Sequence, residues 1–116
     1  MTEAKAVTLS LDEVRALTIR CLEINGCNSA NAAAVADVIH AAERDGAKSH
    51  GLFRLPGYVK SLRSGKVNGH AAPTVEDLAP GALRVVGDGG FAPLAQQRGL
   101  SPLIERAKSQ GLAALA

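Results

Sequence analysis

The chain has 116 residues, a length that suits one domain with a modest core. Hydrophobic residues make up 47% and charged residues 21%, which is typical of a globular protein and excludes a disordered segment. The net charge is +2 and the Lys and Arg residues are scattered, so we expect no nucleic-acid partner.

The sequence carries no signal for membrane insertion, export or metal binding. No apolar run is long enough to cross a bilayer, and residues 1–5 lack the apolar core of a signal peptide. We therefore expect no membrane association and a cytoplasmic location. Cys21 and Cys27 belong to no metal-spacing motif, so we expect reduced thiols and no metal site.

Two amphipathic helices are predicted at the start of the chain. Ser10 and Glu13 have the spacing of a capping box, and Asn25-Gly26 ends the first helix. Its apolar positions are Leu11, Val14, Leu17, Cys21 and Leu22. The second helix is predicted over residues 29–44, ended by Asp45-Gly46. Its predicted apolar face consists of Ala33, Ala36, Val38, Ile39 and Ala42.

A third helix is predicted over residues 51–64. Pro56 fits there if the helix begins near Leu52, because the proline then falls near the first turn, where a missing N–H costs little. Turn-forming residues mark the connection that follows: Asn68, Gly69, Pro73 and Pro80. A short strand is predicted inside this connection, around residues 74–78.

The last third of the chain has a strand–helix–strand pattern. A strand is predicted over residues 82–86, a helix over 95–109, and a final apolar strand over 111–116. Pro102 lies inside the helix and is unexplained. Because domains rarely end inside an apolar run, we expect the chain to be truncated or continued by a second polypeptide.

The turn Gly87-Asp88-Gly89-Gly90 lies between a predicted strand and a predicted helix, where a phosphate-binding loop would be placed. It has neither the G-x-G-x-x-G pattern nor the G-K-[ST] ending of a P-loop. A plain strand-to-helix turn explains it more simply. We therefore assign no cofactor-binding residue within this chain.

The segment Lys48-Ser49-His50-Gly51-x-x-Arg54 carries the clearest chemistry. Hydride addition to a 2-oxo or 2-imino acid leaves charge on O or N, which the imidazolium of His50 can neutralise with a proton. The guanidinium of Arg54 can bind the substrate carboxylate through two parallel hydrogen bonds. Ser49 can orient the base or the substrate, and on a helix positions 50 and 54 would share one face.

A structural interpretation competes with this one, and spacing alone favours it. Ser49 would be a helix N-cap, His50 a surface residue and Arg54 a solvated helix charge. His40 and His70 have no partner close in sequence, so both are expected to be structural or solvent-facing.

The wider sequence resembles the malate/L-lactate dehydrogenase family of the second, non-Rossmann type. This family includes ureidoglycolate and sulfolactate dehydrogenases and Δ1-piperideine-2-carboxylate/Δ1-pyrroline-2-carboxylate reductases. The resemblance takes in the two N-terminal helices and three further segments, which are residues 44–58, 62–68 and 85–116. This extent favours the catalytic interpretation of the motif.

The resemblance implies a role for each motif residue. His50 would be the proton donor, Ser49 the hydroxyl that works with it in a relay, and Arg54 the substrate-carboxylate ligand. Lys48 stands where many hydroxy-acid dehydrogenases of the family carry Asp and where cyclic-imine reductases tend to carry Lys. A lysine here would also raise the local positive potential that attracts an anionic substrate.

The resemblance further implies an α/β fold that is not a Rossmann domain. Residues 1–72 would form a helical N-terminal region carrying the Ser-His-Gly-x-x-Arg motif, and residues 73–116 the incomplete start of the cofactor-binding domain, a strand–helix–strand unit. Most of the NADPH or NADH site, and an aspartate that completes the relay, would lie beyond Ala116. Relatives often have Asn-Gly-Phe-Gly where this chain has residues 90–93, Gly-Phe-Ala-Pro, which would alter the following helix.

The implied function is the N-terminal part of an NAD(P)H-dependent reductase of cyclic 2-imino acids. It would form L-proline from Δ1-pyrroline-2-carboxylate and L-pipecolate from Δ1-piperideine-2-carboxylate, and would be inactive without a C-terminal portion. That portion is a candidate separate partner chain, and the family's habit implies a homodimer. Two alternatives remain: a malate, lactate or ureidoglycolate-type dehydrogenase, and a non-catalytic interaction module with an exposed strand edge.

Overall fold

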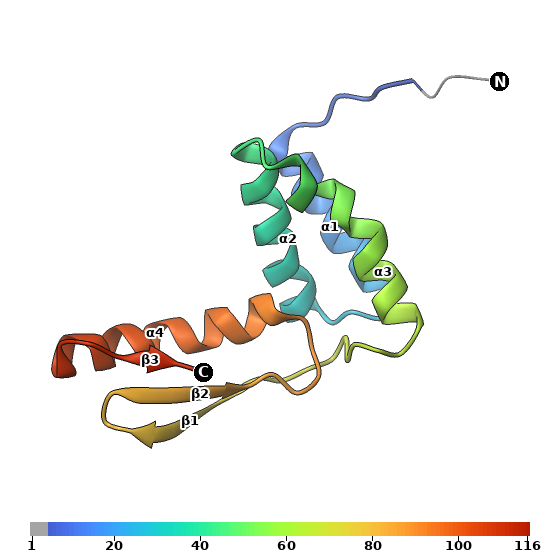
Figure 1. The fold of residues 1–116 in the computed structure, drawn as a ribbon. Helices are drawn as coiled ribbons and strands as arrows, with labels where there is room; N and C mark the ends of the chain where they lie inside the picture. The colour runs from blue at the N-terminus through green and yellow to red at the C-terminus, as the bar shows by residue number, and fades with distance from the viewer. Residues whose placement is uncertain (1–4) are drawn as a thin grey trace.

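The computed structural model describes residues 5–116, which form a layer of helices and, next to it, a small sheet covered by one further helix (Figure 1). The helical layer contains α1 (Leu11–Ile24), α2 (Ser29–Arg44), the 3-10 turns η1 (Lys48–His50) and η2 (Leu52–Arg54), and α3 (Leu55–Arg63). The second part contains β1 (Thr74–Ala79), β2 (Ala82–Val86), α4 (Ala92–Gln110) and β3 (Ala114–Leu115). The predicted α/β class is confirmed.

The predicted capping box begins α1. The Glu13 amide donates to Ser10 Oγ at 3.1 Å, and the Ser10 amide donates to Glu13 Oε1 at 3.2 Å. The buried face of the helix differs from the prediction, because it consists of Val14, Thr18 and Leu22. Thr18 is buried at no polar cost, since its hydroxyl donates to the Val14 carbonyl at 2.8 Å. The predicted face positions Leu11 and Leu17 are exposed.

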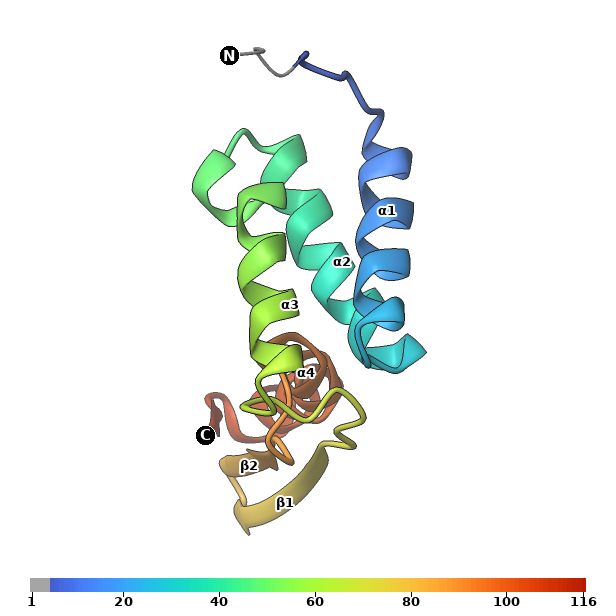
Figure 2. The ribbon, with the colours of Figure 1, turned by 90° about the vertical axis from the view of Figure 1, so that its right-hand side faces the viewer.

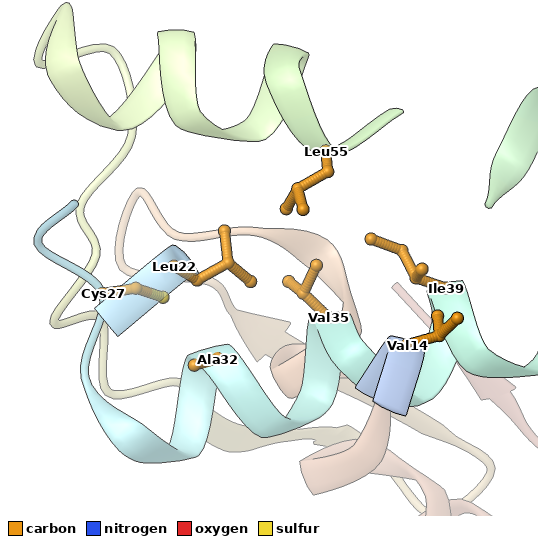
Figure 3. Packing of buried hydrophobic residues seen from close by; sticks show 7 residues of the cluster. All are labelled: Val14, Leu22, Cys27, Ala32, Val35, Ile39 and Leu55. Atoms are coloured by element: carbon orange, nitrogen blue, oxygen red, sulfur yellow. The ribbon is translucent and has the colours of Figure 1, made fainter. Parts of the chain in front are cut away.

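The core lies where α2 packs against α1 and the start of α3 (Figure 3). The helix has the predicted bounds, and the Asn28 side chain caps it by accepting from the Asn31 amide at 3.0 Å. Its buried apolar positions are Ala32, Ala34, Val35, Ala36 and Ile39. Of the predicted face, Ala36 and Ile39 are buried and Ala33 and Ala42 are half-buried, whereas Val38 is exposed, so the prediction is wrong at Val38. Alanine lies all round this helix, so the neighbouring elements decide which side is buried.

The predicted third helix is broken into shorter pieces. A 3-10 turn occupies Leu52–Arg54, and the α-helix begins at Leu55. Pro56 lies in the first turn of α3, where its missing N–H has no helical acceptor to lose. Leu55 is buried in the core, and this contact anchors the start of the helix beside α2.

The predicted strand–helix–strand unit is confirmed as β2, α4 and β3. β1 and β2 form an antiparallel hairpin, and β3 pairs in parallel with the other edge of β2. α4 begins at Ala92, three residues earlier than predicted, because Pro93 is tolerated in a first helical turn. The helix continues through Pro102, and nothing in the structure explains why a proline stands there.

A glycine lets α4 approach the sheet closely. A Cβ atom added at Gly99 would lie 2.6 Å from Leu115 Cδ2 and 2.8 Å from Val85 Cγ2. The helix crosses the end of the helical layer (Figure 2). There the Gln97 side chain donates to Asp37 of α2 at 3.4 Å. The division into regions 1–72 and 73–116 stays a prediction.

The glycine-rich turn after β2 is held by the connection that precedes β1. The Asn68 amide donates to the Gly89 carbonyl at 2.8 Å, and the Ala72 amide donates to Asp88 Oδ2 at 3.0 Å. Asp88 has a left-handed backbone, with φ of 55°. The Asp88 carboxylate thus accepts a hydrogen bond from this chain's own backbone, as expected of a structural turn.

Candidate functional site

The predicted motif lies in the link between α2 and α3. Gly46, with φ of 75°, turns the chain out of α2, and the Ala47 amide donates back to the Ala42 carbonyl at 2.8 Å. The turns η1 and η2 follow, separated by Gly51. The expectation that positions 50 and 54 share a face of one helix is therefore wrong, yet both side chains line the same pocket.

Ser49 and His50 are bonded to each other. Ser49 Oγ lies 2.8 Å from His50 Nδ1, and both side chains are exposed. Because Nδ1 is engaged by the hydroxyl, Nε2 is the ring nitrogen left to exchange a proton with a bound molecule. Ser49 is not a helix cap: Ala47 and Gly51 precede the two turns, without side-chain hydrogen bonds. The expectation of a Ser49 N-cap is wrong, whereas the exposed His50 and Arg54 agree with the structural interpretation.

Arg54 is tied to the same segment. Its Nε donates to the Ser49 carbonyl at 2.9 Å, and its amide donates to the Gly51 carbonyl at 2.9 Å. Among residues 5–116, neither terminal guanidinium nitrogen has a hydrogen-bond partner. In arginines generally, these two nitrogens can bind a carboxylate in a fork.

His50 and Arg54 open onto a cavity of about 480 Å³ at the surface. Its other walls come from α2, α3 and the residue before α4, and consist of Val38, Gly57, Tyr58, Ser61 and Phe91. The rings of Tyr58 and Phe91 meet edge to face, with centroids 4.9 Å apart and planes at 82°. The pocket thus combines an imidazole, a guanidinium, two hydroxyls and an apolar wall.

Sequence reasoning missed part of this lining. Tyr58 and Ser61 lie four and seven residues after Arg54, so helical spacing from the motif would have found them. Val38 and Phe91 carry no such signal, because distant parts of the chain bring them to the motif.

The remaining predicted residues lie elsewhere. Lys48 is exposed and does not line the cavity, so its part in substrate binding stays a prediction. His40 is half-buried on α2, and His70 is exposed in the connection. Within residues 5–116, no three His, Cys, Asp or Glu side chains come together as a metal site. No helix in that range is both long and apolar enough to cross a membrane.

The charges beside the motif are partly paired. Arg44 Nε donates to Asp45 Oδ1 at 2.8 Å, and a second bond joins the same two side chains at 3.1 Å. The hydrogen bond from Arg44 lowers the pKa of the Asp45 carboxyl, and the same bond raises the pKa of Arg44. Asp45 is thus paired with its neighbour Arg44, whereas Lys48 has no anionic partner among the described residues.

The profile of the malate/L-lactate dehydrogenase family matches residues 9–116, and the chain belongs to this family. The members of the family are NAD(P)-dependent dehydrogenases. The resemblance stated from the sequence is therefore confirmed.

Among individual proteins, the chain is similar to two cyclic-imine reductases and to a malate dehydrogenase. The chain is 46% identical over 110 residues to the Δ1-pyrroline-2-carboxylate/Δ1-piperideine-2-carboxylate reductase of Pseudomonas aeruginosa, covering 95% of this chain and 33% of that protein. The crystal structure of Δ1-piperideine-2-carboxylate reductase from Pseudomonas syringae pv. tomato superposes with a TM-score of 0.91 at 40% identity, over 96% of this chain and 33% of that one. Malate dehydrogenase from Pyrococcus horikoshii gives 0.82 at 29% identity, over 99% and 34%. The chain spans about a third of the length of these relatives.

Proposed function

We propose that this chain is the N-terminal part of an NAD(P)H-dependent reductase of cyclic 2-imino acids. Its substrates would be Δ1-pyrroline-2-carboxylate, reduced to L-proline, and Δ1-piperideine-2-carboxylate, reduced to L-pipecolate. The observation that carries the proposal is the single pocket lined by His50 and Arg54, with Ser49 bonded to the imidazole. The names of these relatives support the choice of substrate.

Arg54 would hold the substrate. Its two terminal nitrogens bind the carboxylate, and the bond from Nε to the Ser49 carbonyl limits where the guanidinium can move. A fixed carboxylate places the adjacent C2 atom and the ring nitrogen of the imine at one position in the pocket. Such positioning lowers the entropic part of the barrier.

His50 would supply the proton. Reduction adds a hydride to C2 and a proton to the ring nitrogen, so that the C=N bond becomes a C–N single bond. Protonated His50 donates that proton from Nε2, and the Ser49 hydroxyl at Nδ1 then connects the imidazole to further proton donors. The nicotinamide dinucleotide, when bound, supplies the hydride.

The pocket suits a small ring. Its volume of about 480 Å³ accommodates a five- or six-membered cyclic amino acid with a carboxylate at one end. Tyr58 and Phe91 offer aromatic surface to the methylene groups of that ring, while the charged groups lie at its polar side.

The glycine-rich turn of this chain is a poor site for a dinucleotide phosphate. The glycine-rich turn is bonded to the connection, and Pro93 removes one amide from the first turn of α4. We therefore assign most of the NADPH or NADH site to the remaining two-thirds of the relatives' length. On this proposal the 116 residues are inactive alone, the remainder is supplied in the same chain or as a separate one, and the complete enzyme is a cytoplasmic homodimer.

A second candidate is a 2-hydroxy acid dehydrogenase. It is favoured by the likeness to the malate dehydrogenase of Pyrococcus horikoshii, because an imidazole and an arginine also suit a 2-oxo acid. Lys48, in place of the aspartate often found there, favours the imine reductase.

The deciding experiment is a substrate panel on the complete protein. Oxidation of NADPH and NADH would be followed with both cyclic imines, oxaloacetate and pyruvate. We expect kcat/KM to be highest with a cyclic imine. Preference for an oxo acid would establish the second candidate, and no turnover with any substrate, despite correct folding, would favour a non-catalytic interaction module.

A further inference from the structure

A carboxylate outside the pocket holds the motif in place. The Leu52 amide donates to Glu43 Oε1 at 2.8 Å, although the two residues are nine positions apart in the sequence. Glu43 lies in the last turn of α2, whose buried residues Val35 and Ile39 are fixed in the core. The bond therefore ties the far end of the motif to the most firmly packed helix of the layer.

The segment between these two residues, 44–51, forms a loop that is closed at its base. The first closure is the bond from the Ala47 amide to the Ala42 carbonyl, at 2.8 Å. The second is the Glu43 carboxylate, which accepts from the first amide of η2. That amide has no acceptor of its own within so short a turn.

The absence of a side chain at Gly51 leaves room for the Glu43 carboxylate. Gly51 is buried, and a Cβ atom added to it would lie 2.6 Å from Glu43 Cδ and 2.9 Å from Glu43 Cγ. Its φ of −90° is not left-handed, and the observation against a side chain here is the clash with Glu43. A side chain at position 51 fits only if the Glu43 carboxylate leaves its bonded position.

We propose that Glu43 is a positioning residue for the reaction. Its hydrogen bond to the Leu52 amide holds the side chains of His50 and Arg54 in the relative positions that the reaction needs. This inference rests on the proposed function. His50 precedes Leu52 by two residues, and Arg54 follows it by two residues. Glu43 does not line the cavity, so it does not touch the substrate.

Geometry explains Glu43 better than charge does. A negative group near a pocket that binds a carboxylate weakens the attraction for that anion. Glutamine keeps an acceptor oxygen at the same place and removes the charge. Glu43→Gln should therefore retain the positioning, whereas Glu43→Ala should lose it.

The test uses four variants of the complete protein: Glu43→Gln, Glu43→Ala, Gly51→Ala, and Glu43→Ala combined with Gly51→Ala. Glu105→Ala is the matched control, because Glu105 is an exposed helical glutamate of α4, far from the motif in the sequence. The readouts are hydrogen exchange of the Leu52 amide, affinity for the planar analogue pyrrole-2-carboxylate, and the separate values of kcat and KM for the imine.

In Glu43→Ala we expect faster exchange at Leu52, and a loss of about 10- to 100-fold in kcat/KM, the scale expected when a catalytic group is misplaced by about 1 Å. The analogue should bind more weakly as well. Glu43→Gln and the control should stay close to wild type. Gly51→Ala should behave like Glu43→Ala, and the double variant should be no worse than either single variant, because the two changes remove one interaction.

Unchanged exchange and unchanged analogue affinity in Glu43→Ala would overturn the inference, as would additive losses in the double variant. Loss of activity in Glu43→Gln as large as in Glu43→Ala would also overturn it, by showing that the charge acts instead. The proposed function fails separately: a wild-type protein that neither binds the analogue nor reduces the imine would refute it, while exchange at Leu52 still reports on the Glu43 bond.

Discussion

The ring of Phe91 meets the ring of Tyr58 edge-on, at a centroid distance of 4.9 Å. Phe91 is the residue that precedes α4, and Tyr58 lies on α3, so this contact joins the strand–helix unit to the helical layer at the pocket. The connection around Asn68 and Asp88 fixes the turn that leads to Phe91. The wall of the site therefore depends on the docking of the two parts of the chain.

Truncation of Phe91 should loosen that wall. Phe91→Ala removes a ring–ring contact worth about 0.5–1.5 kcal/mol beyond the area it buries. In the complete protein we expect KM for the cyclic imine to rise more than kcat falls, together with a lower Tm. Phe91→Leu, which restores apolar bulk without the ring, should recover most of the Tm. An unchanged KM in Phe91→Ala would show that the ring is not part of the substrate site.

The second prediction concerns His50, the proposed proton donor. Its side chain is exposed and carries little of the core, so His50→Ala should leave the Tm almost unchanged. Turnover should fall by about 100-fold or more, the usual contribution of a positioned general acid. Ser49→Ala should cause a smaller loss, because the hydrogen-bond partner of Nδ1 is removed. Full activity in His50→Ala would refute the assignment.

Arg54 allows a test of carboxylate binding by geometry rather than charge. Arg54→Lys keeps the charge but replaces a fork with a point donor. A hydrogen bond to a charged group is worth about 1.5–3 kcal/mol, so KM should rise by about 10- to 100-fold, with a smaller effect on kcat. Arg63→Lys, a change to an exposed arginine outside the cavity, is the matched control. Equal KM values for Arg54→Lys and wild type would contradict the proposed role.

Local signals predicted the elements better than the packing. The capping box at Ser10, the bounds of α2 and the order β2–α4–β3 all follow from short-range patterns. The buried side of α2 did not, because alanines surround the helix and only its packing against α1 and the start of α3 places Val35, and not Val38, in the core. The early start of α4 at Ala92 was hidden by Pro93, which indicates either a break or a first turn.

The candidate site likewise has one part that the sequence predicts and another that only tertiary contacts show. Ser49, His50 and Arg54 lie in one short motif, and the resemblance to a family gave them roles. The support of that motif by Glu43 comes from a hydrogen bond across nine residues, with no spacing rule behind it. The aromatic wall requires a tertiary contact between residues 58 and 91.

The cysteines should differ in reactivity. Burial raises the pKa of the Cys27 thiol, and the nearby Glu23 carboxylate adds to the effect, whereas Cys21 is half-buried. In native protein Cys21 should therefore be alkylated first, and Cys27 only after unfolding. The folded state holds the Cys27 proton more tightly than the unfolded state, so stability should fall as pH rises through the ordinary thiol pKa. Equal alkylation rates for the two thiols in native protein would contradict the burial of Cys27.

The last prediction concerns the contact between α4 and the sheet. Gly99→Ala adds a Cβ that overlaps Leu115 and Val85, and overpacking of this kind costs about 1–3 kcal/mol. The gain in helix propensity from glycine to alanine is at most about 1 kcal/mol. The variant should thus be destabilised, as measured by urea unfolding. Gly57→Ala is the matched control, because a Cβ there meets nothing within 4 Å in α3, and it should be neutral or stabilising. If Gly99→Ala were as stable as Gly57→Ala, the close approach of α4 to β2 and β3 would be wrong.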